Sequence, residues 1–228
     1  MSSTTPRIAP AARRFDLIVF DWDGTLFDST GLIVRCIQAA CRDIGHQVPS
    51  DADAAYVIGL GLRDALQHAA PGLPPERHPE LGNRYRHHYF ASQHELVLFP
   101  GTLEMLQALK ARNHCLAVAT GKARRGLDDA LAHVQLAGVF DSTRTADETQ
   151  SKPHPMMLQQ LMSEFSVEPS RTLMIGDTTH DLQLALNAGT PRVGVSYGAH
   201  APDAFGAFEP LFIAPHTRAL HDWLLVNA

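Results

Sequence analysis

Short runs of apolar residues alternate with amphipathic stretches along most of this chain. Residues 17–20 (Leu-Ile-Val-Phe) are wholly apolar, as is typical of a parallel strand that is covered on both faces. Comparable runs recur at residues 115–119, 172–175, 193–195 and 211–213. Helical periodicity lies between them, over residues 102–112, 155–165 and 178–188. This alternation predicts an α/β fold, a doubly wound parallel sheet with a Rossmann-like core.

Residues 29–95 break that rhythm. No strand-like run occurs there, and helical patterns cover residues 32–44, 63–69 and 75–94. We therefore expect an inserted α-helical cap domain over residues 29–95, and an α/β core formed by residues 15–28 and 96–228. Residues 1–14 contain no acidic residue and carry two prolines, so we expect a disordered tail.

Composition narrows the classes of partner and compartment. The net charge of -5 argues against a nucleic-acid partner, because no excess of Lys and Arg is available to neutralise phosphates. No apolar run approaches the length of a membrane span, so we expect no membrane partner. The three cysteines form no C-x-x-C pair, and a cytoplasmic location is the simplest expectation. The sequence leaves monomer or homodimer undecided.

Two carboxylates follow the first predicted strand. Asp21 and Asp23 stand two residues apart, so an extended backbone projects both to the same side, and Gly24 permits the turn that follows. Two carboxylates this close repel unless a cation lies between them or one holds a proton. The pair therefore indicates a functional site rather than a polar turn.

Polar residues follow the other strands as well. Thr120 and Gly121 offer a hydroxyl and a backbone N–H to an anion, although Thr120 as a helix cap is an equal alternative. Lys152 precedes a helix and is a candidate phosphate ligand. Asp177 and Asp181 stand four residues apart, with Asp177 also suited to be a helix N-cap. Such oxygen ligands suit Mg²⁺.

These segments, in this order, resemble the haloacid dehalogenase-like hydrolase superfamily, and within it the phosphoglycolate phosphatase-like subgroup with a helical cap. The family's D-x-D-G-T motif is matched by residues 21–25, and its G-D-x-x-x-D motif by residues 176–181. Thr120 matches the Thr or Ser of the second motif, and Lys152 matches the basic residue of the third. The resemblance covers nearly the whole chain after the tail.

The resemblance implies a Mg²⁺-dependent phosphatase that acts on a small phosphorylated metabolite through an aspartyl-phosphate intermediate. Asp21 would be the nucleophile and Asp23 the general acid and base. Mg²⁺ would be held by the Asp21 carboxylate, the Asp23 backbone carbonyl and Asp177, with Asp181 in support. Thr120, Lys152 and backbone N–H groups near Trp22 and Gly121 would neutralise the phosphate oxygens.

Several readings remain open. Residues 59–63 fall where such caps carry a substrate-contacting loop, which makes Arg63 a candidate contact to a substrate anion, but an ordinary turn between helices explains them nearly as well. Dehalogenases that resemble this chain lack an acid at the position of Asp23, and cleavage of a phosphate ester needs a proton for the leaving oxygen. A β-phosphoglucomutase-like phosphomutase or a pyrophosphatase shares the same core. A catalytically silent binding module is the remote alternative.

Overall fold

The computed structural model describes residues 13–228, so the predicted tail lies outside the described residues for all but its last two positions. The described chain contains a six-stranded sheet with the order β3-β2-β1-β4-β5-β6. All neighbouring pairs are parallel. The strands are β1 (Leu17–Phe20), β2 (Cys115–Thr120), β3 (Ser142–Thr145), β4 (Thr172–Gly176), β5 (Arg192–Val195) and β6 (Ile213–Ala214). The doubly wound parallel sheet is confirmed.

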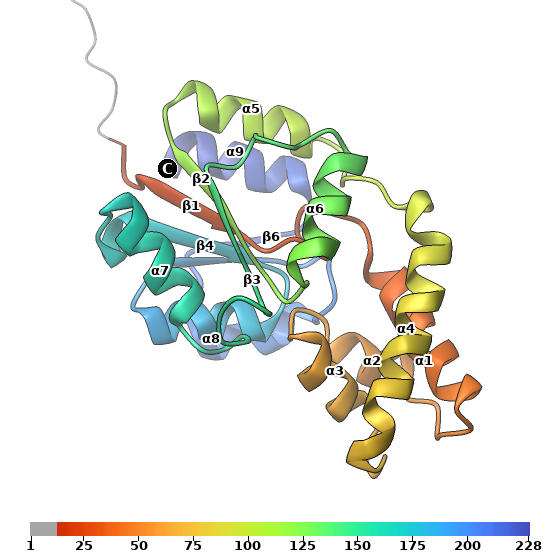
Figure 1. The fold of residues 1–228 in the computed structure, drawn as a ribbon. Helices are drawn as coiled ribbons and strands as arrows, with labels where there is room; N and C mark the ends of the chain where they lie inside the picture. Colours follow the sequence, from red (N-terminus) through yellow and green to blue (C-terminus); the bar gives the residue numbers. More distant parts are fainter. Residues whose placement is uncertain (1–12) are drawn as a thin grey trace, which may run out of the picture.

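Strand β1 is buried on both faces, and alternate side chains belong to different layers of the core. Ile18 and Phe20 pack in the cluster that contains residues of α5 (Thr102–Ala111), α6 (Arg124–His133) and α9 (Thr217–Asn227). Leu17 and Val19 pack in the cluster formed with α7 (Met156–Phe165) and α8 (Thr179–Ala188). Because strand side chains alternate with a period of two, this run of four apolar residues connects both helical layers. Figure 1 shows the two helical layers on opposite faces of the sheet.

Four helices form the inserted cap, which lies beyond one end of the sheet (Figure 1). They are α1 (Thr30–Asp43), α2 (Asp51–Tyr56), α3 (Leu62–Ala69) and α4 (His78–Ser92). Short 3₁₀ turns lie on either side of α4, at Pro75–Arg77 and Gln93–Glu95, and two more lie in the core, at Pro169–Arg171 and Pro202–Phe208. A separate apolar cluster, which includes Cys41, Leu66 and Leu81, holds the cap helices together. The inserted helical cap is therefore confirmed as part of the fold. No helix among residues 13–228 is long and apolar enough to cross a membrane.

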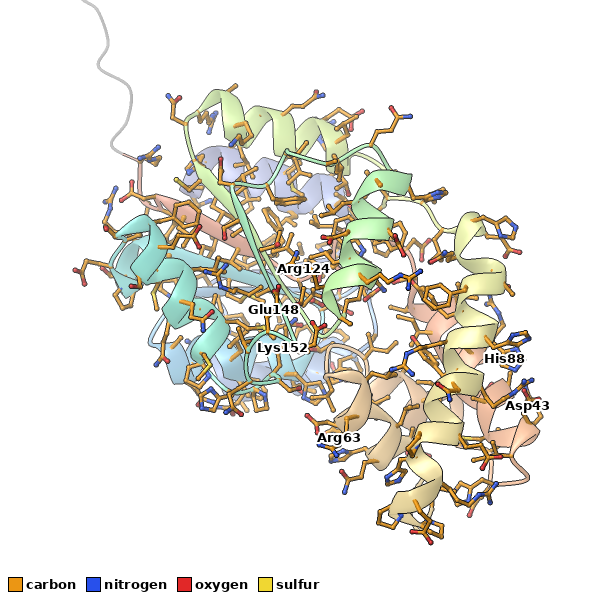
Figure 2. All side chains as sticks on the ribbon, in the orientation of Figure 1. Asp43, Arg63, His88, Arg124, Glu148 and Lys152 are labelled. Carbon is orange, nitrogen blue, oxygen red and sulfur yellow. The ribbon has the colours of Figure 1, made fainter. Side chains whose placement is uncertain are left out.

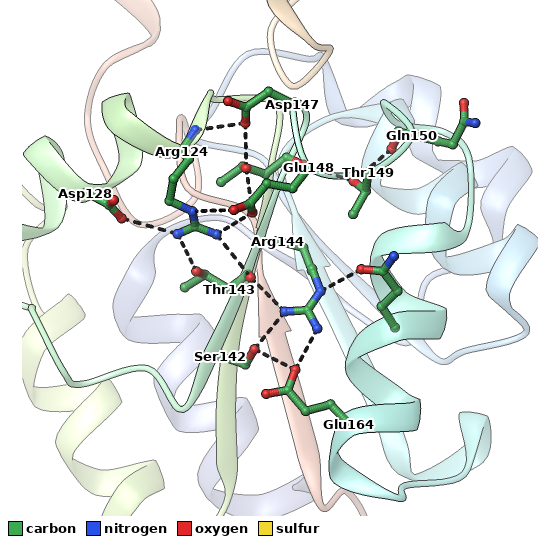
Figure 3. Close-up of polar contacts among 12 residues, drawn as sticks. Arg124, Asp128, Ser142, Thr143, Arg144, Asp147, Glu148, Thr149, Gln150 and Glu164 are labelled. Atoms are coloured by element: carbon green, nitrogen blue, oxygen red, sulfur yellow. Dashed lines mark hydrogen bonds and ion pairs between the residues drawn. The ribbon is translucent and has the colours of Figure 1, made fainter.

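The edge strand β3 was not predicted, because its sequence Ser-Thr-Arg-Thr contains no apolar residue. It pairs with β2 on one side only, and its first three residues are half-buried. Ion pairs replace apolar packing here: Arg144 contacts Glu164 of α7 at 2.7 Å, and Arg124 of α6 contacts Glu148 at 2.6 Å (Figure 3). These contacts fix the segment that leads from β3 to Lys152.

Some predicted boundaries were wrong. The run at residues 211–213 was predicted as a strand, but β6 begins at Ile213, and Leu211 is 43% exposed. Helix α6 begins at Arg124, with Ala123 as its N-cap, so Thr120 does not cap it. In both places an element of the expected type is present, but it begins at a later residue than expected. Where an element begins depends on contacts with other segments.

We expect Leu158→Ala to lower the free energy of unfolding by about 2–5 kcal/mol, because it removes a fully buried side chain between α7 and the sheet and leaves a cavity. Urea denaturation measures this change. Leu103→Ala is the matched control, since Leu103 is 43% exposed on α5 and its truncation should change stability by less than about 1 kcal/mol. Equal losses in the two variants would contradict the assigned core.

Candidate active site

The candidate site lies where the order of strands in the sheet reverses, on either side of β1. Strand β1 lies between β2 and β4, so the chain first builds the sheet on one side of β1 and then returns to the other side. Such a switch point leaves a crevice at the carboxyl ends of the strands. The register brings the residues after β1 and β4 together, and the Asp21 N–H donates a hydrogen bond of 2.8 Å to the Ile175 carbonyl.

Three carboxylates converge at this point. Asp21, Asp177 and Asp181 each offer an oxygen within 4.8 Å of the others, and all three are buried. The Lys152 ammonium lies between two of them, with its Nζ 2.6 Å from Asp21 Oδ1 and 2.6 Å from Asp181 Oδ1. Lys152 is itself buried, within the core rather than the cap (Figure 2). Residues separated by more than 150 positions are thus joined in one charged cluster.

Burial and mutual repulsion raise the pKa of two carboxyls in this cluster, those of Asp21 and Asp177. Burial is the largest cause for Asp21, whose pKa lies well above its usual value. The charge of Lys152 lowers this pKa, and the charges of Asp181 and Asp177 raise it. Burial and the charge of Asp181 together raise the pKa of Asp177 to about 7. For Lys152, burial alone would lower the pKa, but the charges of Asp181 and Asp21 outweigh it and the pKa is raised. The cluster holds three acids and one cation, so it favours a further positive charge.

Besides the contact with Lys152, four hydrogen bonds fix the carboxylates of Asp177 and Asp181. Asp177 accepts from Thr25 Oγ1 at 2.9 Å and from the Ala199 N–H at 2.7 Å. Asp181 accepts from the Thr178 N–H and hydroxyl and completes a capping box at the start of α8. The sequence suggested Asp177 as a possible N-cap of this helix, but the N-cap is Thr178. The Asp177 carboxylate faces the cluster instead.

This arrangement fits a hard divalent cation. Asp21 Oδ2 is buried and has no hydrogen-bond partner among the described residues, whereas buried polar atoms are normally paired. Mg²⁺ prefers carboxylate and carbonyl oxygens and needs only one or two protein carboxylates. Gly24 keeps the turn open beside the cluster: its φ is +82°, and a Cβ there would lie 2.1 Å from Asp177 Oδ2.

Asp23 lies near the cluster but has different partners. Its two carboxylate oxygens lie 2.9 and 3.0 Å from Lys122 Nζ, and the Ser29 hydroxyl donates to Oδ1 at 2.6 Å. Lys122 also contacts the hydroxyl of Tyr89, on cap helix α4, at 2.9 Å. Burial alone would lower the pKa of Lys122, but Asp23 and the tyrosines raise it, so this lysine is a cation. The two acids of the first motif therefore serve separate ion pairs.

The cap loop of residues 57–61 lies directly on the core. A Cβ on Gly121 would lie 2.3 Å from the Leu60 carbonyl oxygen and 2.5 Å from that of Gly59, so only a glycine permits this approach. The Gly61 N–H donates to Ser151 Oγ at 2.8 Å. The Tyr56 carbonyl accepts from His180 Nε2 at 2.8 Å and from His200 Nε2 at 3.0 Å. The cap is thus closed over the strand ends.

The remaining predicted site residues occupy different positions. Thr120 is buried at the end of β2, and its Oγ1 accepts from the Lys122 N–H at 3.1 Å. Trp22 is fully buried between the two acids of the first motif. Arg63 is exposed on α3 of the cap (Figure 2), outside the carboxylate cluster. It lines a cavity of about 620 Å³ between cap and core, together with Asp23 and Gly121.

Sequence reasoning missed several contributors to the site. Lys122 and Tyr89 meet at Asp23, although 33 positions separate them and no motif joins them. Ala199 contributes only its backbone N–H to Asp177, which no side-chain pattern can show. The available signal was position: residues 196–200 follow strand β5 at the carboxyl edge, where ligand-binding loops occur in this type of sheet.

Comparison with known proteins agrees with this arrangement of sheet, cap and strand-end acids. Residues 18–195 match the sequence profile described as haloacid dehalogenase-like hydrolase, and the chain belongs to that family. It is 35% identical over 202 residues to "Probable phosphatase IndB" of Dickeya dadantii (strain 3937), covering 86% of this chain and 88% of that protein. It is 30% identical over 221 residues to "Phosphoglycolate phosphatase" of Vibrio vulnificus (strain YJ016), covering 93% and 97%.

A solved structure supports the same assignment. The crystal structure described as "a predicted phosphoglycolate phosphatase from haemophilus somnus 129pt" superposes with a TM-score of 0.83 at 26% identity. The superposition covers 96% of this chain and 100% of that one. The chain is therefore a hydrolase of the haloacid dehalogenase-like family, similar over nearly its full length to proteins named as phosphoglycolate phosphatases.

We expect Gly121→Ala to lower kcat/KM by about tenfold or more, since the added methyl would displace the cap loop and a small misplacement at a reacting centre is costly. Steady-state kinetics with a phosphate ester measures it. In Gly206→Ala, the control, the new methyl meets no atom within 4 Å and should not alter the rate. Parent kinetics in a folded Gly121→Ala protein would show that the closed loop is not needed.

Proposed function

We propose that this chain is a Mg²⁺-dependent phosphatase that hydrolyses a small phosphate monoester through an aspartyl-phosphate intermediate. The observation that carries the proposal is the position of Asp21, whose Oδ1 is bound to Lys152 while its buried Oδ2 has no partner among residues 13–228. A carboxylate held in this way is an available nucleophile. Membership of a hydrolase family supports the proposal.

In the first half-reaction, an oxygen of Asp21 attacks phosphorus as the bond to the leaving oxygen breaks. Lys152 and the backbone N–H groups after β1 and β2, near Trp22 and Gly121, offset the negative charge on the phosphate oxygens, and Thr120 adds a hydroxyl. The proton on Asp23 passes to the leaving oxygen, because an alkoxide is a poor leaving group. The products are an alcohol and the phosphorylated Asp21.

In the second half-reaction, water attacks the phosphorus of the aspartyl phosphate. Asp23 accepts the proton of that water, and the bond between Asp21 and phosphorus breaks to release inorganic phosphate. The contacts with Lys122 and with the Ser29 hydroxyl fix the orientation of Asp23. The closed cap excludes bulk water until the products leave.

The residues that would hold Mg²⁺ are Asp21, Asp177 and the backbone carbonyl of Asp23, with Asp181 in support through Lys152 and Thr178. When bound, the metal would neutralise charge between the carboxylate nucleophile and the anionic phosphate. Asp177 suits this role because Thr25 and Ala199 fix both of its oxygens in place.

The finer assignments are also part of the proposal. The division into a core of residues 15–28 and 96–228 and a cap of residues 29–95 separates the phosphoryl chemistry from recognition of the leaving group. The three cysteines are unpaired, which is consistent with a reducing cytoplasm. A phosphomutase would return the phosphoryl group to a sugar instead of water. Release of inorganic phosphate, without isomerisation of β-glucose 1-phosphate, separates the two activities.

We expect Asp21→Asn to abolish release of inorganic phosphate from phosphate monoesters, because an amide cannot form the acyl phosphate. A phosphate-release assay with Mg²⁺ measures turnover, and thermal unfolding checks the fold. Asp203→Asn, an exposed aspartate on the surface, is the matched control and should keep parent activity. Parent-level turnover in a folded Asp21→Asn protein would show that the nucleophile is another group.

We expect the rise in melting temperature caused by Mg²⁺ to be larger at pH 8 than at pH 6. The pKa of Asp177 is raised to about 7, so below this pH the metal must displace a proton, and its apparent affinity falls by up to about tenfold per pH unit. The stability of metal-free protein should change with pH in the opposite sense. The raised pKa of Asp177 favours the folded state at low pH, and this contribution is lost as pH rises through about 7.

Differential scanning calorimetry across this pH range, with and without Mg²⁺, measures the effect. Asp177→Asn should show little Mg²⁺ shift at any pH, whereas Asp203→Asn should behave as the parent does. An Mg²⁺ shift that is the same at both pH values would contradict the assignment of Asp177 as a ligand.

A further inference from the structure

The cavity between cap and core is much larger than the smallest phosphate esters need. Its volume of about 620 Å³ extends from Asp23 to the cap helices. Pockets of roughly 300–1,000 Å³ accommodate ligands of drug size. Because Asp23 is the group that would give a proton to the leaving oxygen, the alcohol released by the enzyme must occupy this space. A two-carbon acid would fill a small part of it.

One wall of the cavity is apolar and aromatic. It is formed by Ile33 and Ile37 of α1 and by Tyr85, Tyr89 and Phe90 of α4. The rings of Tyr85 and Tyr89 stack, with centroids 5.9 Å apart. Aromatic side chains favour stacked or edge-on contacts with other flat rings, whereas a carboxylate loses its hydration against such a wall.

Of the four cations among the described residues that line the cavity, three are exposed to solvent and the fourth is already paired. Among the described residues that line it, Arg63, Arg86 and Arg125 are exposed to solvent. Lys122 is the least exposed cation, and its ammonium already contacts both oxygens of Asp23 and the hydroxyl of Tyr89. An ammonium has three donors, so these contacts saturate it. Lys122 is therefore not free to pair with a carboxylate on the leaving group, and such a group would depend on the exposed arginines.

Another part of the cavity wall is polar. Residues 149–151 (Thr-Gln-Ser) line the cavity on the core side and carry hydroxyl and amide groups. Such groups suit the hydroxyls of a sugar, while the cap wall suits a flat ring system. A leaving group that contains both a sugar and a flat ring system therefore matches the two parts of the wall.

We propose that the leaving group is a bulky alcohol with a sugar portion and a flat apolar ring system, which makes the substrate a nucleoside 5′-monophosphate rather than the phosphate ester of a two- or three-carbon acid. This inference rests on the proposed phosphatase function and specifies its substrate class.

The test compares kcat/KM for adenosine and uridine 5′-monophosphates, ribose 5-phosphate and phosphoglycolate under identical conditions with Mg²⁺. Ribose 5-phosphate supplies the sugar without the ring system and so isolates the contribution of the aromatic wall. We expect at least one of the two nucleotides to exceed both smaller esters by about tenfold or more, the effect of burying one ring against an apolar wall. A preference for phosphoglycolate, or equal values for all four, would overturn the inference.

A variant that narrows the cavity provides a second test. Gly126 of α6 lines the cavity, and a Cβ there would meet no atom within 4 Å, so the backbone accepts a side chain at this position. Gly126→Trp is designed to place a large side chain at the cavity wall. The ratio of nucleotide to phosphoglycolate kcat/KM should fall by about tenfold, the effect expected of a blocked apolar site. Val226→Trp, at a position 83% exposed on α9, is the matched control and should leave the ratio unchanged. An unchanged ratio in folded Gly126→Trp protein would count against the assigned cavity.

A binding measurement separates failure of this inference from failure of the proposed function. Should no ester release phosphate, the proposed phosphatase function fails by itself. Isothermal titration of the Asp21→Asn protein then still ranks the ligands without turnover. Tighter binding of adenosine 5′-monophosphate than of phosphoglycolate supports the cavity assignment, and equal or weaker binding overturns it.

Discussion

The contact on which this site depends is the pair of hydrogen-bonded ion pairs made by Lys152. Its ammonium joins Asp21, at the end of β1, to Asp181, in the first turn of α8. A buried carboxylate without such a partner would be strongly disfavoured. One lysine cannot balance three acids, so the cluster keeps a raised pKa at Asp21 and Asp177 and an affinity for another cation. The ion pairs of Lys152 allow the carboxylates to be buried, and the excess of negative charge favours binding of a further cation.

The cap completes the site through close contacts that depend on small side chains and backbone groups. The Gly59 and Leu60 carbonyls lie against Gly121, and the Tyr56 carbonyl accepts from His180 and His200. The hydroxyl of Tyr89 reaches Lys122, the partner of Asp23. Because these contacts involve both the cap and the strand-end loops, the contacts that close the cap also position Lys122 beside Asp23.

The two parts of the molecule have different tasks. The sheet provides fixed positions for charged groups, since strand ends are held by hydrogen bonds on both sides. The cap provides the apolar wall of the cavity, which under the proposed function would contact the leaving group. This separation explains how one core is compatible with several phosphate chemistries, and why similarity in the core motifs says little about the substrate.

The sequence by itself determined the fold class, the inserted cap and the positions of the strand-end acids. Apolar runs record burial on both faces of a strand, and D-x-D-G-T and G-D-x-x-x-D record local chemistry, so both can be read along the chain. The edge strand β3 could not be predicted from an apolar pattern, because it is polar and is supported by the ion pair between Arg144 and Glu164. Only the tertiary structure decided that Lys122 holds Asp23, that Thr178 rather than Asp177 caps α8, and that Arg63 stands apart from the carboxylates. These facts depend on contacts between distant segments, and the distance between such segments is set by packing and not by local pattern.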